Sequence, residues 1–390
     1  MNNKKNNQIL LFLGLMGFLA NGDVYSVAPL LINIAKDFSI QLSQAALSVT
    51  SYMIAFGLFT VLIGPLGDRF GKSKIMIIAS FGSAIFSCLT YFAPNIDLLI
   101  WLRFINGAFS AGIMPVSMAI IIEELDETKR QMGIAKLMGM MTLGGATATI
   151  IGGALSYYTS WRMVYFIYGF AELLIAILLL AVLPRRNGTL TKLNYFEAYR
   201  GVLANNQRLW SILAIVLLTG FCVFGSFAFS GQLIQSATNL NVLMIGLILA
   251  AFGFGGIAGS RFAVLIRKKI GDRICLIAGV IGAISLFAVS TISSIPWLVI
   301  AWLGFGVSFI WLHSTMIMVA QSTKPEMKGS IMSLISFCVF VGSGIGTIIN
   351  RRFLETVSLN FIFQIAALTF FVLGLIALIT LNFNKSFARN

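Results

Sequence analysis

The sequence of 390 residues is poor in the side chains on which most enzymes rely. It contains one histidine, His313, and four cysteines, none of them paired at the spacing of a metal site. Metal-dependent or histidine-based catalysis needs several ligands or a base with a partner, which one histidine does not supply. A GxxxxGK[ST] phosphate-binding loop is also missing, which excludes an ATP-driven pump within this chain. We therefore expect no enzyme activity, no metal and no cofactor.

Charged residues are scarce as well, at 10% of the chain, whereas 58% of the residues are hydrophobic. A soluble domain is about one quarter charged, so this chain has more apolar surface than one core in water can bury. Apolar runs of about 20 residues are long enough to cross a bilayer as helices. The sequence predicts an all-α membrane protein with twelve transmembrane helices: 8–32, 42–66, 75–94, 98–122, 132–157, 162–184, 209–235, 241–266, 273–292, 296–320, 329–350 and 358–383.

The net charge of +14 reflects topology better than it reflects a nucleic-acid partner. With the N-terminus in the cytoplasm, nearly all basic residues outside the helices fall on the cytoplasmic side. The opposite loops hold only Lys36, Arg162, Arg351 and Arg352. This distribution is the positive-inside pattern of membrane proteins. We predict a multi-pass protein of the cell membrane, embedded in the lipid bilayer, with both termini cytoplasmic and no bound nucleic acid.

The chain divides into two halves of six predicted helices each, residues 1–184 and 209–390. The basic, polar segment 185–208 between them is expected to be a cytoplasmic linker, part of which forms a short surface helix. In both halves an acid, a base and a glycine precede the fifth helix, at residues 126–133 and 326–329. A repeated six-helix unit is typical of transporters built from two pseudo-symmetric bundles.

A motif follows the second predicted helix, with the sequence GPLGDRFGKSK over residues 64–74. Its glycines remove side chains where helices approach closely, and Gly71 allows a tight turn. Asp68 is an acid in a basic loop and needs a partner, for which a helix N-terminus is suitable. The motif resembles the signature loop of the major facilitator superfamily, whose members have twelve helices in two pseudo-symmetric bundles.

By this resemblance, the motif forms a conformational latch on the cytoplasmic side. Asp68 would contact the start of the eleventh helix near Lys328, and Arg69 would reach an acid at the end of the fourth helix. The alternative is a solvated charged loop. The residues assigned to the latch are Gly64, Asp68, Arg69, Gly71, Lys72, Glu123 and Glu124.

Three ionisable residues lie well inside predicted helices, where charge is costly, and each is therefore a functional candidate. Asp23 in the first helix and Arg103 in the fourth lie at similar depth, so an ion pair is feasible. Burial favours the neutral carboxyl and a nearby arginine favours the carboxylate, so moving Arg103 would change the proton affinity of Asp23. The alternative is a permanent ion pair that joins two helices. Glu172 in the sixth helix is the third proton-coupling candidate, unless it faces a neighbouring helix.

Further motifs resemble those of the drug/proton antiporter branch, which implies multidrug efflux. The arginine–x–x–x–glycine pattern that begins at Arg103 resembles the fourth-helix motif of this branch. The acid at Asp23, with a tyrosine two residues later, loosely resembles a region of bicyclomycin- and chloramphenicol-type exporters. Residues 148–153 (ATIIGG) keep the glycine pair of the antiporter motif and lack its glycine–proline pair.

The residues expected to line a substrate cavity are mostly aromatic or uncharged polar, which suits an amphipathic or aromatic solute. The alternative for His313 is a hydrogen-bonded packing residue, which a lone buried histidine more often is. The predicted lining is Asn21, Tyr25, Tyr52, Asn106, Met138, Phe224, Gln232, Trp311 and His313.

Three function classes fit these features. The preferred one is a secondary active transporter, a monomer that exports small amphipathic compounds in exchange for protons by alternating access. A proton-coupled importer or symporter of a nutrient has the same fold and the opposite flux. A non-transporting membrane sensor is the third class, although a sensor is expected to carry a soluble output domain.

Overall fold

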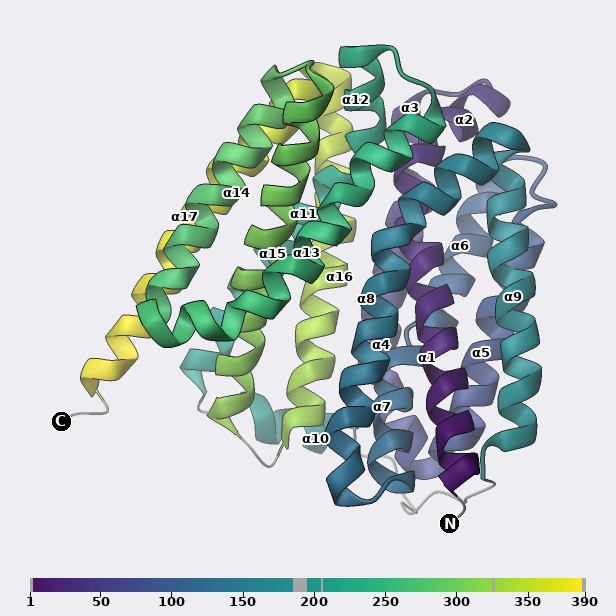
Figure 1. Cartoon of the computed structure of the whole chain (residues 1–390), viewed down its shortest axis with the longest axis vertical. Helices are drawn as coiled ribbons and strands as arrows, with labels where there is room; N and C mark the ends of the chain where they lie inside the picture. Colours follow the sequence, from purple (N-terminus) through teal and green to yellow (C-terminus); the bar gives the residue numbers. More distant parts are fainter. Residues whose placement is uncertain (1–2, 185–194, 205, 325–326, 388–390) are drawn as a thin grey trace.

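The computed structural model describes residues 3–184, 195–204, 206–324 and 327–387, and these ranges contain helices and no strand (Figure 1). Long apolar runs become helices because lipid offers no partner to backbone N–H and C=O groups, which a helix satisfies within itself. The first half comprises α1 (Asn3–Tyr25), α2 (Val27–Asp37), α3 (Leu42–Ala45), α4 (Leu47–Phe70), α5 (Lys72–Thr90), α6 (Ile96–Ser110), α7 (Ile113–Glu124), α8 (Glu127–Tyr158) and α9 (Trp161–Val182). The second half comprises α11 (Gln207–Phe227), α12 (Ser230–Thr238), α13 (Val242–Ile270), α14 (Ile274–Thr291), α15 (Ile295–Thr323), α16 (Lys328–Thr356) and α17 (Leu359–Phe387), and α10 (Tyr195–Leu203) lies between the halves.

The number of membrane crossings agrees with the sequence prediction. Within the described ranges, eleven helical segments are long and apolar enough to cross a membrane. One of them, Val242–Thr291, contains both α13 and α14, joined by the 3-10 turn η1 (Gly271–Arg273). The described residues therefore make twelve crossings, which agrees with the predicted all-α, twelve-helix architecture.

Two of the crossings are broken by prolines, where the sequence predicted continuous helices. A proline has no N–H to bond the carbonyl four residues earlier, and its ring collides with that carbonyl. Pro29 stands four residues after Tyr25, where α1 ends, and Pro115 stands four residues after Ala111, where α6 gives way to α7. The first and fourth crossings are therefore each built from two helices.

The two halves repeat the same helix pairings. In the first half α1 packs on α8, α4 on α6, and α5 on α9. In the second half α11 packs on α16, α13 on α15, and α14 on α17, and each of these pairs lies six crossings after its counterpart. The halves lie side by side and meet through α8 against α13 and through α4 against α16 (Figure 1).

The two ends of the molecule differ in how closely the halves approach. The start of α1, the helix α10 and the end of α17 lie at one end, called the α10 end, and α2, α3 and α12 lie at the other, the α12 end (Figure 1). Toward the α12 end a side chain at Gly246 would place its Cβ 2.2 Å from the carbonyl oxygen of Thr149. Toward the α10 end, Gly64 and Gly329 have open space beside them. The halves are therefore in close contact at the α12 end and apart at the α10 end.

The helix α10 lies within the predicted linker 185–208 and contacts both halves. The Tyr199 hydroxyl donates a hydrogen bond to the carbonyl oxygen of Val61 in α4 at 2.7 Å. Lys324, which follows α15, donates to the carbonyl oxygen of Gly201. The predicted short helix is therefore present, and the linker residues 185–194 and 205 lie outside the described residues.

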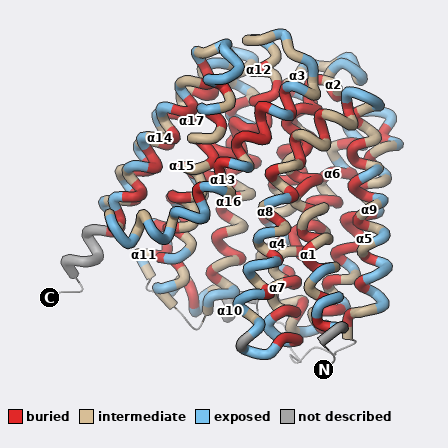
Figure 2. The backbone as a smooth tube through the Cα atoms, viewed as in Figure 1, coloured by how far each residue is buried: buried red, intermediate tan, exposed pale blue. Residues whose placement is uncertain are grey.

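Buried residues follow the interior of each half, and the outward faces stay exposed (Figure 2). Large apolar side chains on these faces are open, for example Trp101 at 63% and Leu368 and Ile284 at 65%. Extensive apolar exposure is unfavourable in water and is favourable against acyl chains. The outer surface is therefore matched to lipid.

Candidate functional site

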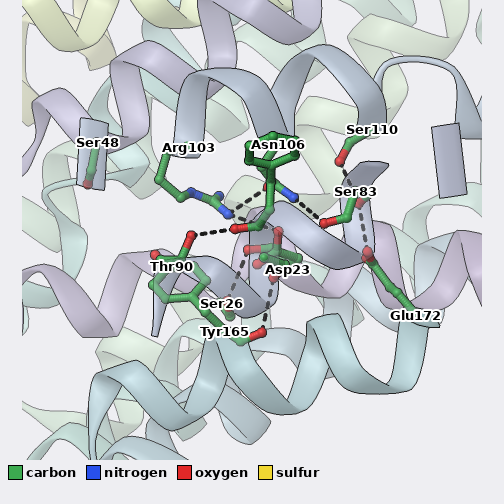
Figure 3. Close-up of polar contacts among 12 residues, drawn as sticks. Asp23, Ser26, Ser48, Ser83, Thr90, Arg103, Asn106, Ser110, Tyr165 and Glu172 are labelled. Atoms are coloured by element: carbon green, nitrogen blue, oxygen red, sulfur yellow. Dashed lines mark hydrogen bonds and ion pairs between the residues drawn. The ribbon is translucent and has the colours of Figure 1, made fainter. Parts of the chain in front are cut away.

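A buried ion pair joins α1 to α6 inside the first half (Figure 3). Arg103 Nη1 lies 2.9 Å from Asp23 Oδ2, and the two side chains are 2% and 1% exposed. The ion pair that the sequence indicated as feasible is therefore present. A charge this far from water is tolerated only when it is paired, so each of these residues requires the other.

Two aromatic rings enclose the guanidinium group of Arg103. Its central carbon lies 4.3 Å from the ring centroid of Tyr52 and 4.7 Å from that of Tyr165. The faces of aromatic rings attract cations. Gly107, one turn beyond Arg103, allows this packing, because a Cβ there would lie 2.4 Å from the carbonyl oxygen of Tyr52. The glycine of the arginine–x–x–x–glycine pattern thus lets α6 approach α4.

Hydrogen bonds continue from the ion pair to the third buried ionisable residue (Figure 3). Arg103 Nη1 also donates to Asn106 Oδ1 at 2.9 Å, and Asn106 Nδ2 donates to the carbonyl oxygen of Ser83 at 2.9 Å. Ser83 Oγ donates to Glu172 Oε2 at 2.6 Å. Asp23, Arg103 and Glu172 therefore belong to one polar cluster, formed by α1, α5, α6 and α9.

The polar cluster leaves several buried polar atoms without a hydrogen-bond partner among the described residues, including the donor Arg103 Nε and two carboxylate oxygens. Asp23 Oδ1 and Glu172 Oε1 are buried, and neither has a hydrogen-bond partner among the described residues. Buried polar atoms usually have a partner. Each of these free oxygens is a position at which a carboxyl group can hold a proton without breaking an existing hydrogen bond.

A cavity lies between the two halves, on the side of α1 that faces away from the polar cluster. It has a volume of about 120 Å³, and no acidic or basic side chain lines it. Its lining comes from α1 and α8 of the first half and from α11, α13 and α15 of the second. The main lining side chains are Asn21, Tyr25, Thr142, Thr149, Phe227, Phe252, Phe309 and Ile310.

Two of the predicted cavity residues, Asn21 and Tyr25, line this cavity. Phe224 lies directly behind the lining, because its ring packs edge-on against Tyr25 with 5.6 Å between centroids. His313 is also behind the lining, stacked on Phe309 at 5.2 Å. Its Nδ1 is buried and lacks a partner within the described ranges.

The other predicted cavity residues lie elsewhere. Tyr52 and Asn106 face the polar cluster, because Arg103 draws both of them toward the interior of the first half. Trp311 is fixed between α15 and α13, where its Nε1 donates to the carbonyl oxygen of Gly259 at 3.0 Å. Met138 on α8 and Gln232 on α12 are not part of this lining. Most of the polar and aromatic residues that the sequence singled out thus serve helix packing or the ion pair.

Asp23 does not line the cavity, although it stands between Asn21 and Tyr25 in the sequence. Residues two positions apart on an α-helix point about 200° apart around its axis. Asp23 therefore faces the interior of the first half while its neighbours face the cavity. A rotation or tilt of α1 would move both sites at once.

The motif at residues 64–74 lies at the α10 end. Gly71 has a φ of 94°, which favours glycine, and it ends α4 so that α5 begins at Lys72. Lys72 contacts Glu123 at the end of the fourth crossing and lies 3.6 Å from Asp68. Arg69, predicted to reach Glu123 or Glu124, lies over the ring of its neighbour Phe70 at 5.0 Å, and the contact with Glu123 is made by Lys72. The turn at Gly71 brings Lys72 rather than Arg69 to the end of α7, where Glu124 is also buried.

Asp68 and the start of α16 border the same cavity of about 290 Å³. The first half contributes Gly64, Asp68 and Lys72, and the second contributes Gly329 and neighbouring serines. Asp68 is 47% exposed, and its ionic contact in the described part of the chain is with Lys72 and not with α16. The predicted contact between Asp68 and the eleventh crossing is therefore open in this conformation.

The sequence profile of the Major Facilitator Superfamily matches residues 13–347 and, in a second match, residues 228–386. The chain belongs to the Major Facilitator Superfamily. Membership makes it a transporter of small molecules rather than an enzyme, and it accounts for the two related halves.

Similar proteins cover nearly the whole chain. An uncharacterized MFS-type transporter of Bacillus subtilis, YceJ, is 27% identical over 354 residues, which cover 87% of each chain. A bicyclomycin resistance protein homolog of Haemophilus influenzae is 23% identical over 378 residues, which cover 91% of this chain and 92% of the other. A bacterial homolog of the human lysosomal transporter Spinster, solved in an inward-facing and unoccupied conformation, shares the fold with a TM-score of 0.77 at 16% identity, over 97% of this chain and 96% of the other.

Sequence reasoning missed several residues of the site. Ser83 and Tyr165 contact the ion pair or its extension, and nothing distinguishes them in sequence from other residues of apolar helices. Thr142 and Thr149 had a signal, since polar residues seven apart lie on one face of a helix. That face of α8 turned out to border the cavity.

Proposed function

We propose that this transporter exports small amphipathic compounds in exchange for protons. The observation that carries the proposal is the buried ion pair of Asp23 and Arg103, in which Asp23 Oδ1 has no partner among the described residues. The same helix presents Asn21 and Tyr25 to the cavity between the halves. One helix thus connects a group able to bind a proton with a place able to bind a solute.

The α10 end is assigned to the cytoplasm, which places both termini there. The assignment rests on the positive-inside pattern, because Arg200 in α10, Arg208 at the start of α11 and the basic segment 267–273 lie at this end. The halves, 1–184 and 209–390, would move as units joined by the linker 185–208. In this orientation the cavity beside Asp68 opens to the cytoplasm and the α12 end is closed to the outside.

Coupling would arise from a change in the distance between Arg103 and Asp23. While the guanidinium is close, the carboxylate is stabilised as an anion. If rocking of the first half carries Arg103 away, the buried carboxylate loses its counter-charge, and proton uptake becomes favourable. Return of Arg103 would expel the proton. Because α1 also borders the cavity, the same movement would alter the solute site.

The cavity supports an uncharged or weakly charged amphipathic solute. Aromatic rings provide apolar contact, and Asn21, Thr142 and Thr149 offer hydrogen bonds without a fixed charge. Its volume of about 120 Å³ is below that of most ligand pockets, which start near about 300 Å³, so loading would require α8 and α13 to separate. The relative named for bicyclomycin resistance is consistent with export of a compound of this kind.

Export can be tested in cells that express the protein, with Nile red as a neutral fluorescent probe and ethidium as a cationic one. Cells that express the protein should accumulate less of the neutral probe than cells with an empty vector. A protonophore should make the two accumulations equal. Asp23→Asn, at matched membrane abundance, should behave like the empty vector. Higher accumulation on expression would show import, and efflux that survives the protonophore would contradict proton coupling.

A further inference from the structure

A second pocket lies at the α10 end of the second half, and it shares no lining residue with the cavity between the halves or with the polar cluster. Its volume is about 390 Å³. The ends of α11, α13, α15 and α17 surround it, so it lies where these helices leave the apolar layer. Its charged and polar lining consists of Arg208, Arg267, Asp272 and Ser322.

The positive charge of this pocket is only partly compensated. Arg267 Nη2 lies 3.3 Å from Asp272 Oδ1, so these two charges offset each other. Arg208 has no ion-pair partner within the described ranges, and its Nε is buried there without an acceptor. A buried N–H without an acceptor is costly. An anion in the pocket would balance the charge of the second arginine.

The surroundings add to the positive potential. Arg208 is the second residue of α11, whose N-terminus carries a partial positive charge. Met318, Val319 and Leu381 form the apolar side of the pocket. A ligand with an anionic head and an apolar body would therefore find both chemistries in one place.

We propose that this pocket binds a phosphate group, which Arg208 holds through its guanidinium group and Arg267 holds while it remains paired with Asp272. A guanidinium group matches phosphate oxygens with parallel N–H donors. Two sources can deliver this chemistry at the end of a membrane helix, namely the headgroup of an anionic phospholipid and free phosphate from the aqueous phase. Basic pockets between helix ends on the cytoplasmic side are suited to such headgroups.

The test is the thermal stability of the purified full-length protein in a neutral detergent. Samples contain dioleoyl phosphatidylglycerol, dioleoyl phosphatidylcholine or inorganic phosphate, each titrated at constant ionic strength. Arg208→Gln removes the donor without breaking an ion pair of the described residues, and Arg208→Lys keeps the charge without the planar donor group. Lys268→Gln is the charge-matched control, because Lys268 is exposed, neighbours Arg267 and does not line the pocket.

Phosphatidylglycerol should raise the unfolding temperature of the wild type. Arg208→Gln should raise the lipid concentration at half-saturation about tenfold or more, the size expected for a hydrogen bond to a charged group. Arg208→Lys should raise it less. The Lys268→Gln control should titrate like the wild type, and phosphatidylcholine should have little effect. If inorganic phosphate gives the same Arg208-dependent shift and the lipid does not, the site takes free phosphate. Equal stabilisation of wild type and Arg208→Gln, or no stabilisation of the wild type by either ligand, would overturn the proposal. None of these stability measurements tests Asp23, so the proposed phosphate site and the proposed transport function are tested independently.

Discussion

Arg103 contacts only one of the two carboxylate oxygens of Asp23. Its Nη1 donates to Oδ2 at 2.9 Å, and Oδ1 is buried without a partner among the described residues. The same Nη1 also donates to Asn106 Oδ1. A pair that served only to join α1 and α6 would gain from a two-pronged contact, which guanidinium and carboxylate groups form readily. The one-sided geometry leaves Oδ1 as the atom at which the proposed proton exchange would take place.

Glu172→Gln should lower proton-driven transport by less than about tenfold, because glutamine keeps an oxygen that accepts the hydrogen bond of Ser83 and only the charge of the acceptor is lost. Glu172 is linked to the ion pair through Ser83 and Asn106, so it acts at a distance from Asp23. Initial rates of probe efflux in energised cells would measure the loss. A loss as complete as that of Asp23→Asn would instead make Glu172 the principal proton carrier.

Gly107→Ala should destabilise the protein, because the new Cβ would lie 2.4 Å from the carbonyl oxygen of Tyr52. Overpacking of this kind costs about 1–3 kcal/mol. The unfolding temperature in detergent would report the loss. Gly139→Ala is the matched control, since nothing lies within 4 Å of a Cβ at that helical position. An equal response of the two variants would contradict the close packing of α6 on α4.

Asp68→Ala should slow turnover while leaving substrate affinity nearly unchanged. Asp68 faces the start of α16 across an open cavity, so its loss should act on closure of the α10 end rather than on the solute site. Labelling of a cysteine introduced at Ser330 would show the change, because a greater fraction of this cysteine should be labelled during transport in Asp68→Ala than in the protein that keeps Asp68. Asp97→Ala, at an exposed acid of α6, should match the wild type. Unchanged turnover and labelling in Asp68→Ala would reduce the motif to a solvated loop.

Tyr25→Ala should raise the KM for aromatic substrates severalfold and leave proton binding intact, because Tyr25 lines the cavity and Asp23 does not. KM and the maximal rate, each measured for several substrates, would separate an effect on the solute site from an effect on proton coupling. Tyr157→Ala removes an exposed tyrosine of α8 and should change neither quantity. Loss of proton-driven transport for every substrate, with KM unchanged, would contradict the assignment of Tyr25 to the cavity and of Asp23 to proton binding.

Much of this architecture could be predicted from the sequence, because lipid imposes simple requirements on length and polarity. The twelve crossings, the repeat and the pairing of Asp23 with Arg103 all follow from such requirements. The breaks before Pro29 and Pro115 were also readable in principle, since the carbonyl four residues earlier loses its partner.

The partners of individual side chains could not be predicted. Lys72 rather than Arg69 reaches Glu123 because the turn at Gly71 sets the start of α5, and this depends on three-dimensional packing. Composition likewise did not separate cavity residues from packing residues. Trp311 and Tyr25 are both aromatic residues of apolar helices, and only the helix rotations distinguish their roles.

The most direct test of proton coupling at Asp23 is substrate-induced proton movement in proteoliposomes that contain the purified protein and a pH-sensitive dye. A transported compound added outside wild-type vesicles should enter the lumen while protons leave it. The pH of the lumen should therefore rise. The Asp23→Asn variant should still bind the compound and move no protons. Proton movement of wild-type size in Asp23→Asn would contradict the central claim.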